Sequence, residues 1–276
     1  EPVAVMHFAA FAYVGESVEN PALYYANNCA GTATLLRTLL DFKPIPFVFS
    51  STCATYGIPD SVPIAEDHQQ RPINPYGRSK LFVERMIADI GTANGMPWIA
   101  LRYFNAAGSD PEGEIGENHD PETHLIPLVL RAAQSGARVH IYGTDYDTPD
   151  GTCIRDYVHV SDLADAHVCA LAHLLAGGES GAFNLANDRG YSVREVIETA
   201  ERVSGRRIRT ARAPRRPGDP PKLIGDATRA RRLLKWAPLR SDLEVQIGDA
   251  WRWLEQRQAS PTSRSEVRDL TGGTPA

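Results

Sequence analysis

NPYGRSK, residues 74–80, is the stretch that decides the interpretation of this 276-residue chain. Asparagine is a preferred N-cap and proline suits the first helical turn, so the stretch predicts a helix over residues 76–93 that ends before Gly95. Tyr76 and Lys80 are four residues apart, and this spacing places both side chains on one face of the helix. An ammonium group can therefore lie beside a phenol at the start of the helix.

The pairing of a phenol with an ammonium group suggests a general base. A free tyrosine has a pKa of ~10, and a neighbouring cation lowers that pKa because it favours the phenolate. Thr52 follows the apolar run of residues 47–49, which predicts a buried strand over residues 47–51. Its hydroxyl can share a substrate proton with Tyr76, so Thr52, Tyr76 and Lys80 form a candidate catalytic set. This set suits proton abstraction from an alcohol while hydride leaves for a nicotinamide.

Strand-like and helix-like segments alternate along the chain, which predicts an α/β fold with a doubly wound parallel sheet. Such sheets bind ligands outside the carboxyl ends of their strands. The expected strands are residues 3–9, 47–51, 98–102 and 139–142, with 158–160 extended. The expected helices are residues 21–40, 76–93, 125–134 and 243–256. Two further helices are expected: one is capped by Ser161 and runs to residue 175, and the other begins with a capping box at Ser192 and ends near residue 205. Residues 258–276, rich in Ser, Thr, Pro and Gly, are expected to form a disordered tail.

The composition argues against several classes of protein. A net charge of −5 and a pI near 5.9 predict no nucleic-acid partner and no membrane-surface role. No apolar run approaches the roughly 18 residues of a transmembrane helix. The four cysteines are scattered, with no CxxC and no paired histidine spacing, which favours reduced thiols, a cytoplasmic protein and no metal site.

Longer stretches extend the pattern, among them HFAAFAYVGESVENP (7–21), FSSTCATYG (49–57), LRYFNAAG (101–108), IYGTDYDTPDGTCIRDYVHVSDLADAH (141–167) and APRRPGD (213–219). On these stretches the chain resembles the extended short-chain dehydrogenase/reductase family and, within it, the UDP-glucose 4-epimerase family, from Pro2 to about residue 253. The resemblance implies the remainder of a Rossmann-type NAD-binding domain over residues 1–106. It also implies a smaller C-terminal α/β domain for the UDP-sugar over residues 107–257, of which residues 157–185 pack back on the first domain.

The chain departs from this family at its start. No strand followed by GxxGxxG, the loop that cradles a dinucleotide pyrophosphate, is found in the sequence. The resemblance implies that the first βαβ units, roughly 60–80 residues at ~30 residues per unit, precede Glu1. Without that segment the chain is expected to bind NAD weakly and to be inactive.

The resemblance also assigns the site residues. Lys80 would hold the nicotinamide ribose, Arg155 and Arg216 would bind the UDP diphosphate, and Asp219 would hold the uridine ribose. His124 stands where an asparagine is common in the family, and Leu223 falls where the 2-substituent of the hexose is gated. The implied cofactor-binding residues are Phe8, Ala9, Ala10, Asn27, Asn28, Ser50, Ser51, Tyr76, Lys80, Tyr103 and Phe104. The implied substrate-binding residues are Thr52, Tyr76, Asn105, His124, Leu125, Arg155, Tyr157, Arg216, Asp219 and Leu223.

The implied reaction is the NAD-dependent interconversion of UDP-glucose and UDP-galactose, through a 4-keto sugar that turns over while the UDP stays anchored. Sugar 4,6-dehydratases need an Asp–Glu pair directly after the catalytic threonine, where this chain has Cys53-Ala54, and no glutamate typical of the UDP-glucuronate decarboxylases is found there. Two alternatives stay open: a catalytically inactive fragment that only binds UDP-sugar, and a 4-epimerase for UDP-N-acetylhexosamines or UDP-pentoses. A homodimer through the helices of residues 21–40 and 76–93 is also implied.

Overall fold

The structure is a computed structural model that describes residues 2–41, 44–216 and 218–259. Of the predicted disordered tail, residues 260–276 lie outside the described residues. Among the described residues, no helix combines the length and the apolar character that a membrane crossing requires.

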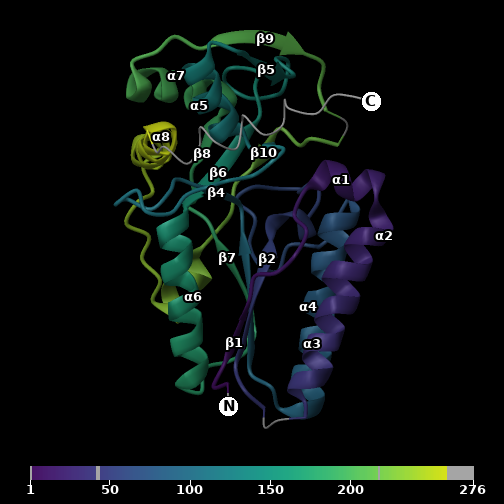
Figure 1. Ribbon diagram of the computed structural model, residues 1–276. Coiled ribbons are helices and arrows are strands. Elements are labelled where there is room, and N and C mark those ends of the chain that lie inside the picture. The colour runs from purple at the N-terminus through teal and green to yellow at the C-terminus, as the bar shows by residue number, and fades with distance from the viewer. Residues whose placement is uncertain (1, 42–43, 217, 260–276) are drawn as a thin grey trace, which may run out of the picture.

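A four-stranded parallel sheet forms the half of the molecule that contains the N-terminus (Figure 1). Its strand order is β1 (Val5–His7), β2 (Phe47–Thr52), β3 (Trp98–Tyr103) and β7 (Gly181–Leu185). Helix α6 (Val160–Leu175) covers one face, and α3 (Thr32–Leu39) and α4 (Pro75–Asn94) cover the other. Because both faces are covered, every residue of β2 is buried, as its continuous apolar run predicts. The Rossmann-type parallel sheet predicted from the alternation of strands and helices is confirmed.

The predicted helix over residues 21–40 is confirmed as a continuous helical run that contains a π-helical stretch. Helix α2 (Pro21–Tyr24) leads into the π-helical turn η1 (Tyr25–Gly31) and then into α3, and a further helix, α1 (Val14–Glu19), precedes them. In η1 the Asn28 amide binds the main chain of Phe11, with Phe11 N donating to Asn28 Oδ1 at 2.9 Å and Asn28 Nδ2 donating to Phe11 O at 3.0 Å. Widened π turns of this kind occur mostly at functional sites. Strand β1 is also shorter than the predicted residues 3–9.

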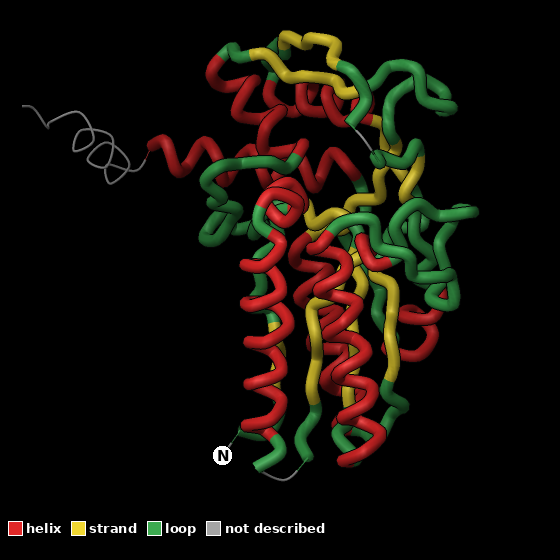
Figure 2. Tube along the Cα trace, turned by 90° about the vertical axis from the view of Figure 1, so that its right-hand side faces the viewer, coloured by secondary structure: helices red, strands yellow, loops and turns green. Residues whose placement is uncertain are grey.

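The other half of the molecule lies beyond the carboxyl ends of these strands (Figure 1). Its first sheet joins β4 (Asn105–Ala107), β6 (Ile154–His159) and β10 (Lys222–Leu223) in parallel, and β8 (Gly190–Ser192) is antiparallel to β6. A second, two-stranded parallel sheet pairs β5 (Arg138–Tyr142) with β9 (Arg209–Ala213). Helices α5 (Leu125–Ser135), α7 (Val193–Ser204) and α8 (Leu243–Ala259) pack around them on a separate apolar core. Figure 2, turned by 90°, shows the long helices of the lower half running alongside the strands.

Helix caps were predicted with mixed success. At α7 the capping box is confirmed, because Glu195 N donates to Ser192 Oγ at 3.1 Å and Ser192 N donates to the Glu195 carboxylate at 2.7 Å. At α6 the prediction was wrong. The cap is His159, whose Nδ1 accepts a hydrogen bond from Ser161 N at 3.0 Å, because β6 continues through the predicted extended segment up to His159.

Candidate active site

Tyr76 and Thr52 meet where α4 begins beside the end of β2. Thr52 ends β2 and caps the short 3-10 helix η2 (Cys53–Thr55), since its Oγ1 accepts a hydrogen bond from Ala54 N at 3.1 Å. Asn74 caps α4 by accepting a hydrogen bond from Gly77 N at 2.8 Å, as the sequence predicted. Gly77 permits the close approach, because a Cβ at this position would lie 2.5 Å from the Ala54 carbonyl oxygen.

The pKa of the Tyr76 phenol is raised in this arrangement. Burial raises the pKa of Tyr76, the nearby Tyr103 phenol raises it further, and hydrogen bonding to Thr52 acts in the opposite direction. The prediction that Lys80 lowers the Tyr76 pKa is therefore wrong for this arrangement of side chains. Thr52, by contrast, lies at the phenol as predicted, and its hydroxyl favours the phenolate.

Lys80 is buried one turn after Tyr76 and faces the sheet. Its Nζ donates a hydrogen bond to the Ser50 carbonyl at 2.9 Å and lies 4.8 Å from the centre of the Phe49 ring. Burial lowers the pKa of Lys80 to about 8, against a smaller opposing effect of the Glu84 carboxylate. The ammonium thus loses its proton far more readily than an exposed lysine.

A buried ion pair between Glu84 and Arg102 lies beside the end of β2. The Glu84 carboxylate accepts hydrogen bonds from Arg102 Nε at 3.0 Å and Arg102 Nη2 at 2.7 Å, and it also accepts one from the Ser51 hydroxyl. This fork-to-fork pairing fixes α4, β2 and β3 to one another. Neither Glu84 nor Arg102 belonged to the predicted site, although Glu84 follows Lys80 by one helical turn.

The predicted cofactor-binding residues gather at the carboxyl ends of three neighbouring strands. Phe8, Ala9 and Ala10 follow β1, Ser50 and Ser51 end β2, and Tyr103 and Phe104 end β3. Phe8 is 57% exposed, and its ring lies 4.6 Å from that of His167, which in turn pairs with the Ser50 hydroxyl at 3.0 Å. The parallel register places these strand ends at one edge of the sheet.

Asn27 and Asn28 reach this region from η1. Asn28 is buried and donates from Nδ2 to the Ser79 hydroxyl at 3.0 Å, on the turn of α4 that also carries Lys80. Asn27 is exposed and donates to Asn28 Oδ1 at 3.0 Å. The structure thus places Asn28, but not the Asn27 side chain, against the catalytic helix.

Four of the predicted substrate-binding residues are joined by the sheet of β4, β6 and β10. Asn105 pairs with Tyr157 in register, and Leu223 pairs with Arg155. The Arg155 guanidinium forms an ion pair with Asp219, and its Nη1 donates to the Ile154 carbonyl at 2.8 Å. The Tyr157 ring lies in the apolar core and not in an open site.

The main chain of Arg216 lies near Asp219. Asp219 N donates a hydrogen bond to the Arg216 carbonyl at 3.2 Å. The Arg216 guanidinium lies 4.0 Å from the centre of the Tyr142 ring, at the end of β5. Of the two arginines predicted to bind one diphosphate, Arg155 thus lies at Asp219 and Arg216 lies at the Tyr142 ring.

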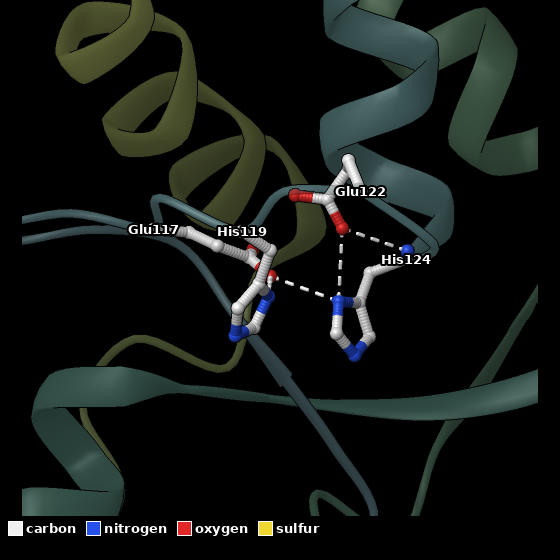
Figure 3. Close-up of side chains that lie close together, drawn as sticks. All are labelled: Glu117, His119, Glu122 and His124. Carbon is white, nitrogen blue, oxygen red and sulfur yellow. Dashed lines mark hydrogen bonds and ion pairs between the residues drawn. The ribbon is translucent and has the colours of Figure 1, made fainter. Parts of the chain in front are cut away.

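Leu125 is the first residue of α5, and His124 directly precedes it. His124 makes no side-chain cap; its Nδ1 lies 2.9 Å from Glu117 Oε1 and 3.0 Å from Glu122 Oε1 (Figure 3). These partners, the hydrogen bond to Glu117 first, raise the pKa of His124. The sequence analysis missed both glutamates and His119, although ENHDPETH (117–124) shows acidic and imidazole residues at short intervals.

Comparison with known proteins identifies the relatives of this chain. A model of the NAD-dependent epimerase/dehydratase family matches residues 1–186. A UDP-glucose 4-epimerase of Rhizobium meliloti (strain 1021) is 52% identical over 260 residues, which are 93% of this chain and 78% of that protein. The chain belongs to the UDP-glucose 4-epimerase family.

Solved structures of UDP-glucose 4-epimerases share its fold. The Brucella ovis enzyme in complex with NAD has a TM-score of 0.87 and 52% identity, over 91% of this chain and 77% of that one. The Bifidobacterium longum enzyme in complex with NAD+ and UDP has a TM-score of 0.85 and 38% identity, over 93% and 77% of the two chains.

Proposed function

We propose that this protein interconverts UDP-glucose and UDP-galactose with NAD as its cofactor. The observation that carries the proposal is the juxtaposition of Tyr76 and Thr52 at the carboxyl ends of parallel strands, with the Lys80 amine one turn along the same helix. Open α/β sheets bind nucleotides at this edge. The related Rhizobium meliloti and Brucella ovis proteins are named UDP-glucose 4-epimerases, which supports the same reaction.

The residues at the strand ends fit a nicotinamide nucleotide. Lys80 has three N–H donors, and among the described residues only the Ser50 carbonyl accepts from it, which leaves donors for the hydroxyls of a ribose. Beside it, the side chains of Ala9 and Ala10 are small and that of Phe8 is exposed, so a flat ring can lie against this edge. When bound, NAD accepts a hydride from C4 of the sugar and returns it to the opposite face of that carbon.

The side chains of this chain then move the proton. Tyr76, in its phenolate form, would remove the proton of the C4 hydroxyl as the C4–H bond breaks and so become a phenol, and Thr52 would orient that hydroxyl. The 4-keto sugar turns over, and the same phenol returns the proton as the new C4–H bond forms. The sugar gains and loses no electrons over the full cycle, so the net reaction is isomerisation.

Arg155, Arg216 and Asp219 would anchor the nucleotide while the sugar turns. A guanidinium presents five N–H donors in a fixed fork that suits phosphate oxygens. Arg155 and Asp219 already bind each other, so their positions are fixed before the substrate arrives. Anchoring through the diphosphate leaves the sugar free to present either face to Tyr76.

The same site argues against a dehydratase reaction and defines a second set of candidate substrates. A 4,6-dehydratase needs an acid/base pair after the threonine, and Cys53, whose pKa burial raises to about 12, does not supply one. Leu223, half-buried on β10, is intermediate in size between residues that exclude and residues that admit an N-acetyl group at C2. UDP-N-acetylhexosamines and UDP-pentoses thus remain the second candidate substrates, and simple UDP-sugar binding without turnover remains the alternative outside catalysis.

Proton NMR of the full-length gene product with UDP-galactose tests the proposal. We expect UDP-glucose to accumulate until the two sugars reach equilibrium, with NAD unchanged in amount. Formation of a 4-keto-6-deoxy sugar, or binding of UDP-galactose without conversion, would overturn it. A parallel reaction with UDP-N-acetylgalactosamine decides whether Leu223 admits the N-acetyl group.

The proposed assembly is a homodimer through α2, η1 and α4. Ala22, Tyr25, Phe82 and Arg85 are exposed on these helices, and Phe82 is 55% exposed. Leu81, expected on the same surface, is buried instead, because it faces the interior of the molecule. Light scattering should give twice the monomer mass for the full-length protein and the monomer mass for Phe82→Glu. A parent protein that is monomeric at micromolar concentration would contradict this assembly.

The four free cysteines support a reducing, cytoplasmic location.

A further inference from the structure

Four potential metal ligands come from eight consecutive residues between β4 and α5. Glu117, His119, Glu122 and His124 each offer one atom, and these four atoms all lie within 4.8 Å of one another. Figure 3 shows the two imidazoles and the two carboxylates turned toward a common centre. A short segment that carries all the ligands loses little chain entropy on closing around an ion.

The distances between the ligand atoms suit a small tetrahedral ion. Glu117 Oε1 lies 2.7 Å from His119 Nδ1 and 2.9 Å from His124 Nδ1, and Glu122 Oε1 lies 3.0 Å from His124 Nδ1. Bonds of 2.0–2.1 Å to a tetrahedral Zn²⁺ separate neighbouring ligand atoms by about 3.3 Å. On binding, these three distances would open by about 0.3–0.6 Å, and the wider separations, all within 4.8 Å, would close to the same value.

Glu122 supplies a separate indication that a cation belongs here. Its side chain is only 1% exposed, and among the described residues its Oε2 has no hydrogen-bond partner. Arg131 Nη2 lies 3.8 Å from that oxygen, too far for a hydrogen bond. Buried polar atoms normally have a hydrogen-bond partner, so this oxygen, which only the ion pair with Arg131 reaches among the described residues, lacks a direct partner.

The types of ligand atom indicate which cation would fit. Imidazole nitrogen together with carboxylate oxygen is a ligand set for zinc and similar transition ions, whereas Mg²⁺ and Ca²⁺ prefer oxygen alone.

We propose that Glu117, His119, Glu122 and His124 form a binding site for a borderline divalent transition cation such as Zn²⁺. The ion fixes the segment of residues 117–124 at the start of α5. That segment is already held to α8, where Trp253 Nε1 donates to the Glu117 carbonyl at 3.0 Å. No metal site was predicted from the sequence, because the chain lacks CxxC and paired histidine spacings.

Calorimetric titration with ZnCl₂ of protein that has been treated with EDTA and dialysed tests the proposal. We expect about one Zn²⁺ per chain with a Kd in the micromolar range or below. His119→Ala and Glu117→Gln should each weaken binding by about tenfold or more. His140→Ala, which removes an exposed histidine on β5, serves as the matched control and should bind like the parent. Co²⁺ should give the visible absorption of a four-coordinate site in the parent and lose it in His119→Ala.

Two results would overturn the proposal. One is the absence of Zn²⁺ binding to the parent in the micromolar range. The other is parent-like binding by both His119→Ala and Glu117→Gln, which would place the ion elsewhere, for example on the free thiols. Two variants are used so that misfolding of one, detected by circular dichroism, leaves the other to decide.

Discussion

The Lys80 ammonium donates its hydrogen bond to the main-chain carbonyl of Ser50, at 2.9 Å, and so ties the catalytic helix to the end of β2. Burial of that amine lowers its pKa to about 8. The burial of this amine therefore makes the stability of the fold depend on pH.

Lys80→Met should abolish one part of that pH dependence. The unfolded chain keeps the Lys80 proton up to the ordinary pKa of 10.5, whereas the folded protein releases it near pH 8. Between these values the unfolded state binds more protons, so the free energy of unfolding of the parent rises with pH, by at most about 3 kcal/mol. Urea unfolding at several pH values should show this rise in the parent and in a Lys222→Met control, but not in Lys80→Met. Parallel profiles for all three proteins would contradict it.

Gly77→Ala should damage the site although alanine favours helices. A methyl group there would meet the Ala54 carbonyl at 2.5 Å and push the start of α4 away from Thr52. Displacement of a catalytic group by about 1 Å can cost on the order of 100-fold in rate, so we expect kcat to fall by about 10–100-fold. Gly248→Ala in α8, where a Cβ meets nothing within 4 Å, is the matched control and should raise the free energy of unfolding by about 0.5–1 kcal/mol. Equal effects of the two substitutions would refute the role of Gly77.

Arg155→Ala should weaken the binding of UDP. Hydrogen bonds to charged groups contribute about 1.5–3 kcal/mol, which corresponds to a Kd roughly 10–100-fold higher. Arg155→Lys should restore little of the loss, because an ammonium cannot form the guanidinium fork. Titration calorimetry with UDP compares these variants with Arg232→Ala, an exposed arginine on η3 (Ala230–Leu234). Parent-like affinity in Arg155→Ala would remove this residue from the proposed site.

Local signals explain what the sequence predicted well. The cap at Asn74, the proline after it and the spacing of Tyr76 and Lys80 act within one or two helical turns, so α4 and the placement of these two residues on it followed from seven residues. The apolar run before Thr52 predicted β2 because a strand covered on both faces reads as continuously apolar.

Long-range contacts explain which features the sequence predicted poorly. The π-helical stretch over residues 25–31 contains Asn28, which binds the main chain of Phe11, and no helical periodicity encodes that contact. The pairing of Arg155 with Asp219 joins residues 64 positions apart and was not predicted, because the family resemblance assigned the two residues to the diphosphate and to the uridine ribose. The raised pKa of Tyr76 reflects the depth of its burial, which the spacing to Lys80 does not predict. The domain boundaries at residues 106 and 257 stay predictions.

Comparison of Tyr76→Phe with the parent, as full-length proteins, tests the central claim most directly. Removal of a general base typically costs ~10²–10⁴-fold in rate, so conversion of UDP-galactose to UDP-glucose should slow by that factor, with the Kd for UDP nearly unchanged. Tyr25→Phe, which alters an exposed tyrosine on η1, should retain the parent rate. Turnover by Tyr76→Phe at the parent rate would show that Tyr76 is not the base and would contradict the account.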